Sequence, residues 1–99
     1  MESLKEIQIE FFETLQSIQE AAVYQALGEY DESDSLEDLL YHATYEAITS
    51  VFELIDGYTN ENLKLDLVEM SKNISLKTGI QMHDKCADYL KWKSEKIVP

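Results

Sequence analysis

The sequence predicts a mainly α fold, a small antiparallel bundle of three long helices in a single domain covering residues 1–99. Apolar residues recur at three- and four-residue steps in three segments, which is the period of one helix face. The three glycines fall near the ends of these segments and the single proline is the last residue, so no strong breaker interrupts them. A 44% share of apolar residues is enough for one modest core.

The first predicted helix begins after Ser3 and ends near Gly28. Ser3 and Glu6 have the spacing of a capping box, in which each side chain accepts a hydrogen bond from a free backbone N–H. Gly28 is suited to the left-handed conformation that closes many helices. The expected core face contains Leu4, Ile7, Phe11, Leu15, Ile18, Ala22 and Ala26.

A second helix follows a short acidic connection, residues 28–35, which has turn formers and almost no apolar content. Ser35 is the expected N-cap, and Gly57 is the expected stop. Glu37 and Asp38 lie where the positive end of the helix dipole favours acids. This helix is predicted to be central because its apolar stripe is broad: Leu36, Leu39, Leu40, Ala43, Ala47, Ile48, Val51, Leu54 and Ile55.

Residues 63–76 are ambiguous between two structures. Alternation of Leu63, Leu65 and Leu67 is typical of a strand, whereas a helical stripe is formed by Leu63, Leu67, Met70 and Ile74. Leucine, lysine, glutamate and methionine favour helix, so a fourth short helix is the expectation. The alternative is a short β-hairpin that turns at residues 71–73 and makes the fold α+β.

The third long helix is predicted to run from Thr78 or Gly79 to about Lys93. Its inward face would contain Ile80, Ala87 and Leu90, with Lys77, Asp84, Asp88 and Lys91 facing solvent. Lysines at the end of this segment suit the negative end of a helix dipole.

Two side chains of this helix are assigned to the core or its edge. His83 is expected to be neutral and to need a hydrogen-bond partner, which an acid of the second helix, Tyr41 or Tyr45 would supply. Cys86, the only cysteine, is expected to be a small buried hydrophobe, and it excludes an internal disulfide.

A polar stripe on the second helix raises the question of a metal site; its members are Asp38, His42, Glu46, Thr49, Glu53 and Asp56. Imidazole and carboxylate one turn apart are able to converge on a divalent ion. His42 and Glu46, with His83 as a third ligand, are therefore the alternative metal-binding prediction. The leading interpretation is a solvated helix face whose histidine is held by neighbouring acids, with no cofactor.

Charge is distributed unevenly along the chain, which has twenty acids, eight lysines, no arginine and a net charge of −12. Residues 1–62 hold fifteen acids and one lysine, hence −14, and residues 63–99 hold five acids and seven lysines, hence +2. A surface of one sign raises encounter rates with partners of the opposite sign. The same charge argues against nucleic acids and anionic membranes as partners.

These features predict a small acidic protein-interaction module that presents a negatively charged helical surface to a basic protein partner. The predicted contact residues are Glu29, Tyr30, Asp31, Glu32, Asp34, Asp38, Glu46 and Glu53. In size, acidity and helix content the chain resembles small immunity proteins that neutralise bacterial toxins, and acidic inhibitors that imitate DNA. The resemblance implies an inhibitor, immunity-like or adaptor role.

Other features predict a cytoplasmic binding protein rather than an enzyme. The sequence has no export signal and no apolar run long enough to span a bilayer. It also has no glycine-rich phosphate loop and no metalloprotease motif. The remaining alternative is a purely structural homodimer in which residues 63–76 or the tyrosines pack against a second copy.

Overall fold

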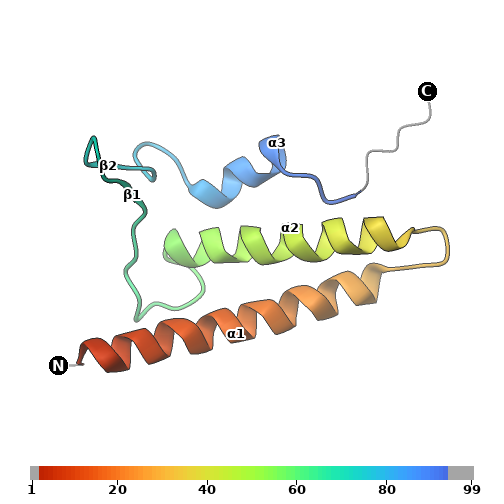
Figure 1. Ribbon diagram of the computed structural model, residues 1–99, viewed down its shortest axis with the longest axis horizontal. Helices are drawn as coiled ribbons and strands as arrows, with labels where there is room; N and C mark the ends of the chain where they lie inside the picture. The colour runs from red at the N-terminus through yellow and green to blue at the C-terminus, as the bar shows by residue number, and fades with distance from the viewer. Residues whose placement is uncertain (1–2, 94–99) are drawn as a thin grey trace.

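The computed structural model describes residues 3–93, and its architecture is mainly helical with one very small sheet. Two long antiparallel helices, α1 (Leu4–Glu29) and α2 (Leu36–Ile55), lie side by side (Figure 1). Residues 82–89 pack on α2, on the side away from α1 (Figure 1). The helix α2 therefore contacts both neighbours, as its broad apolar stripe predicts.

Both long helices start at the predicted residues. The Ser3 hydroxyl accepts a hydrogen bond from the backbone N–H of Glu6 at 3.2 Å. Ser35 and Asp38 form a complete capping box at the start of α2. Each cap provides an acceptor for N–H groups that have no partner within the first helical turn.

The two helices end differently. Gly57 has a φ of 102°, a left-handed conformation that glycine adopts without steric cost, directly after the C-cap residue Asp56. Gly28, in contrast, lies inside α1, which is closed by Tyr30 in an extended conformation. The prediction that Gly28 forms a left-handed cap is therefore wrong, although the predicted end of α1 differs by only one residue.

Residues 63–76 form the hairpin alternative, and the expectation of a fourth helix is wrong. Strands β1 (Val68–Glu69) and β2 (Ile74–Ser75) pair antiparallel, with Val68 opposite Ser75 and Glu69 opposite Ile74. The turn includes Asn73 at a φ of 55°, a left-handed conformation that asparagine tolerates. Of the four residues of the predicted helical stripe, Leu63 alone is buried.

The third long helix is also absent from the described residues. The segment contains a 3₁₀ turn, η1 (Met82–Lys85), followed by a single α turn, α3 (Cys86–Tyr89). On the expected inward face Ile80 is 42% exposed and Ala87 is exposed, while Cys86 is buried as predicted. The backbone N–H of His83 donates to the Asp56 carboxylate, which fixes the start of this short segment on the end of α2.

The core is small and lies where α1, α2 and the loop after α2 meet. Ile18, Leu54 and Leu63 form its centre, and it is surrounded by Phe11, Leu15, Val51 and Leu65. The first residue of each predicted helical stripe remains in solvent: Leu4 is 71% exposed and Leu36 is 65% exposed. Ala26 and Leu54, near the other ends of the stripes, are buried, whereas Leu40 and Ile48 within the α2 stripe are exposed. Apolar spacing thus overestimated the buried face of α2.

Candidate partner-binding site

A pocket of about 320 Å³ lies at the end of the molecule where α1 and α2 are connected. Its lining residues come from the end of α1, the acidic connection, the start of α2 and the chain after α3: Ala26, Glu29, Tyr30, Asp31, Asp34, Asp38, Leu39, His42, Trp92 and Lys93. Five of the eight predicted contact residues are among them. The antiparallel arrangement of the helices brings these five together, because it places the end of α1 beside the start of α2.

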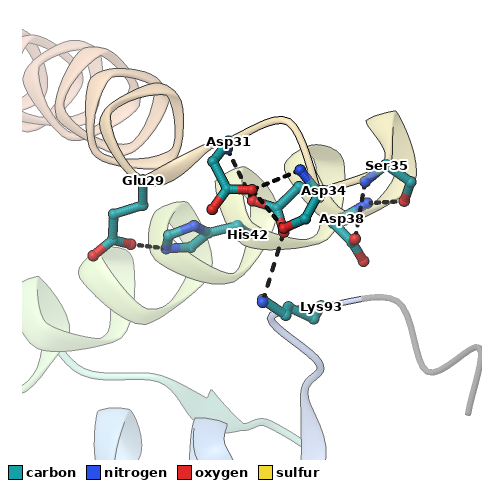
Figure 2. Close-up of polar contacts among 8 residues, drawn as sticks. Glu29, Asp31, Asp34, Ser35, Asp38, His42 and Lys93 are labelled. Atoms are coloured by element: carbon teal, nitrogen blue, oxygen red, sulfur yellow. Dashed lines mark hydrogen bonds and ion pairs between the residues drawn. The ribbon is translucent and has the colours of Figure 1, made fainter.

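Asp31 and Asp34 order the acidic connection. The Asp31 carboxylate accepts a hydrogen bond from the backbone N–H of Ser33 at 2.7 Å, and Asp34 accepts one from the N–H of Asp31 at 3.1 Å (Figure 2). Hydrogen bonds from the Ser33 hydroxyl and backbone, with the nearby Lys93 ammonium, lower the pKa of Asp31 below its ordinary value. Asp31 is therefore held as an exposed carboxylate.

Asp38 contributes a carboxylate at the start of α2. One of its oxygens accepts from the backbone N–H of Ser35 at 3.0 Å, while its own N–H donates to the Ser35 hydroxyl at 3.1 Å (Figure 2). The positive end of the α2 dipole stabilises a negative charge at this position. The local sequence thus fixes this wall of the pocket through the capping box.

His42 forms part of the pocket floor. The prediction of a solvated helix face is wrong at His42, which is only 9% exposed, whereas the expected contact with a neighbouring acid, Glu46, is present. Its Nε2 lies 3.0 Å from a carboxylate oxygen of Glu29 and 3.2 Å from one of Glu46, and its ring meets Trp92 edge-on. His42 therefore links α1, α2 and the C-terminal segment (Figure 2 shows the contact with Glu29).

Trp92 is the residue that sequence analysis missed. It is 57% exposed, lines the pocket and has its ring centroid 6.0 Å from that of His42. As the single tryptophan, between Lys91 and Lys93 at the end of a predicted helix, it was a candidate for a contact anchor.

The other three predicted contact residues lie outside the pocket lining. Glu32 is exposed in the connection, and Glu46 is half-buried against His42. Glu53 lies farther along α2, close enough to His83 to act on it electrostatically. Five of the eight residues therefore line one pocket, and three do not.

The predicted metal ligands are not brought together either. His42 meets Glu46, whereas His83 is bonded to Asp56 at the other end of α2. Within residues 3–93, no group of three or more His, Cys, Asp or Glu side chains is arranged to hold a metal ion.

His83 and Asp56 form a second polar centre, which is structural. The Asp56 side chain is 2% exposed, and its Oδ2 accepts from the His83 backbone N–H at 2.9 Å and lies 2.7 Å from His83 Nδ1. The predicted partner, an acid of the second helix, is confirmed. Tyr58 packs edge-on against the imidazole, with 5.3 Å between the ring centroids.

The sequence predicts a neutral histidine, whereas the direction of the pKa shifts in this pair favours the charged forms. The hydrogen bond that the His83 ring donates to Asp56 and the negative charges of Asp84, Asp56 and Glu53 raise the pKa of His83, although burial opposes them. Burial raises the pKa of Asp56, but the His83 backbone and side-chain hydrogen bonds outweigh it and lower that pKa overall. The pair therefore favours imidazolium and carboxylate.

Comparisons with known proteins found no matching family model, no similar curated protein and no similar solved structure. No helix within the described part of the chain is both long and apolar enough to cross a membrane.

Proposed function

We propose that this protein is a small acidic interaction module that binds a basic protein partner through the pocket between α1, α2 and the chain after α3. The supporting observation is the convergence of Glu29, Asp31, Asp34 and Asp38 around one concave site. Opposite charge speeds association with such a partner, and the exposed aromatic Trp92 offers apolar contact area. An inhibitor or immunity-like role fits this binding mode, and the proposal includes no catalytic step.

The test compares two double variants that change the net charge equally. Asp31→Asn with Asp34→Asn alters the pocket, whereas Glu13→Gln with Glu61→Gln alters two exposed acids outside it. A partner captured from the native host is identified, and its Kd is measured by calorimetry with each variant. We expect the pocket variant to bind about two- to thirtyfold more weakly, from two surface charge pairs, and the control to bind like the unchanged protein.

Salt provides a second measurement with the same partner. Affinity is expected to fall between about 0.05 M and 0.5 M salt, because screening weakens attraction between exposed charges. An affinity that is unchanged over this range, or equal losses in both double variants, would rule out recruitment through the pocket.

A structural homodimer is a second candidate, favoured by the apolar side chains that α1 leaves in solvent near its start. Ile9 is 48% exposed and Phe12 is 64% exposed. Burying such side chains against a second copy would stabilise a small core.

Self-association predicts twice the mass of one chain in light scattering and a shift to monomer in the Ile9→Ala, Phe12→Ala variant. Leu36→Ala, also at an exposed position but outside both α1 and residues 63–76, is the control and should leave the mass unchanged. A single-chain mass at every concentration would dismiss this candidate.

A further inference from the structure

The acidic pocket already holds one cation, and it belongs to the chain itself. The Lys93 ammonium lies 3.7 Å from the Asp34 carboxylate, reaching it from the segment after α3 (Figure 2). The Asp34 side chain is 13% exposed and that of Lys93 is 61% exposed. The Asp34 carboxylate is thus sheltered from solvent, while the Lys93 side chain is mostly in water.

This internal contact is weak. A separation of 3.7 Å is near the limit for an ion pair, and exposed lysine–carboxylate pairs contribute little because water and salt screen them. A cation that fits the pocket better is therefore able to replace Lys93 at small cost.

The pocket lining combines carboxylates with aromatic rings. Glu29, Asp31, Asp34 and Asp38 supply hydrogen-bond acceptors, and Tyr30 and Trp92 supply two aromatic side chains. An ammonium is a compact charge with three donors, whereas a guanidinium is planar, has five donors and stacks on aromatic faces. The lining is therefore chemically suited to a guanidinium.

We propose that this pocket is a subsite for an arginine side chain of the basic partner, and that the arginine displaces Lys93. The inference rests on the proposed function and deepens it by naming the group that the pocket takes. In the free protein Lys93 occupies part of the site. In the complex the guanidinium pairs with the carboxylates around Asp34 and stacks against aromatic lining.

Trp92 makes the proposal measurable, because it is the only tryptophan and lines the pocket. A short blocked peptide with arginine residues and the same peptide with lysines are titrated while tryptophan emission is recorded. We expect saturable binding of both and a Kd about two- to fivefold lower for the arginine peptide, the effect of one exposed cation–π contact. Asp34→Asn should weaken binding of the arginine peptide, and Glu61→Gln should leave its binding unchanged.

Displacement is tested with Lys93→Ala. Removing the competing ammonium is expected to tighten arginine-peptide binding about two- to fivefold, the value of one surface ion pair. Lys72→Ala removes the same charge at an exposed site on the hairpin and should produce a smaller change.

The outcomes separate this inference from the proposed function. Equal affinity for the two peptides would overturn the arginine assignment, and unchanged or weaker binding by Lys93→Ala would overturn displacement. Either result leaves the salt-dependent binding of the captured partner intact. If the captured partner bound the Asp31→Asn, Asp34→Asn variant as tightly as the unchanged protein, the proposed function would instead be refuted.

Discussion

Replacing Asp56 with alanine is expected to destabilise the protein by about 2–4 kcal/mol, the range for losing a buried, charge-assisted hydrogen-bonding group. Asp56 is the C-cap of α2, and its side chain is almost completely buried. It receives two contacts from His83, one from the backbone and one from the ring. The substitution would leave both donors without this acceptor and detach the η1 segment from α2.

Asp84→Ala is the matched control, because the Asp84 carboxylate also faces the His83 ring, at 3.3 Å, but is 67% exposed. This substitution should lower the free energy of unfolding by less than about 1 kcal/mol, because an exposed ion pair contributes little stability. Urea denaturation followed by circular dichroism gives both values. Equal losses in the two variants would show that the Asp56 contact has no special structural role.

The same pair predicts a pH dependence with a definite sign. Asp56 has a lowered pKa, so its stabilising effect is present above the ordinary value of 3.8 and is lost as pH falls through its native pKa. His83 has a raised pKa, so its effect is complete below 6.5 and is lost as pH rises through its native pKa. The pair therefore stabilises most between these two ordinary values.

This dependence is measured as the change in the free energy of unfolding between about pH 6 and pH 8.5, around the ordinary histidine pKa. The unchanged protein should lose more stability over this interval than His83→Gln. His42 is present in both proteins, so its contribution cancels in the comparison. Parallel pH profiles would contradict a raised pKa at His83.

Truncating Leu54 is expected to have a comparable or larger effect. Leu54 is 0% exposed and packs with Ile18 and Leu63, so Leu54→Ala removes the centre of a small core. Leucine-to-alanine changes in cores cost about 2–5 kcal/mol, a large part of the roughly 5–15 kcal/mol that stabilises a typical domain. We expect a strongly lowered denaturation midpoint.

Leu40→Ala provides the comparison for Leu54→Ala, since Leu40 lies on the same helix and is 57% exposed. Its substitution should change the free energy of unfolding by no more than about 0.5 kcal/mol, as is usual for surface positions. If Leu40→Ala proves as costly as Leu54→Ala, the assignment of the core to the α1–α2 contact is incorrect.

Local signals predicted the two long helices well. Ser3 and Ser35 act within their own helical turns, and the Gly57 stop depends on backbone conformation alone. Five of the predicted contact residues line one pocket for the same reason, because Glu29 to Asp38 are close in sequence and a helical hairpin keeps them close in space.

Long-range contacts explain what the sequence did not reveal. The start of the last helical segment is held by Asp56, which accepts a hydrogen bond from the His83 backbone N–H across 27 positions of the chain. The burial of His42 depends on Glu29 and on Trp92, which reaches the site from the far end of the chain. Apolar periodicity contains no information about such partners, so a helix of normal length was predicted for residues 78–93.

The attachment of η1 and α3 has a consequence for how the molecule opens. The α1–α2 hairpin is held by a continuous helix interface, whereas η1 begins where the Asp56 side chain holds the His83 backbone. Cooperative units joined by few buried groups unfold separately and at lower free energy than the rest. The final segment would therefore unfold locally and transiently while the paired helices stay folded. Each such opening would remove Trp92 and Lys93 from the lining of the acidic pocket.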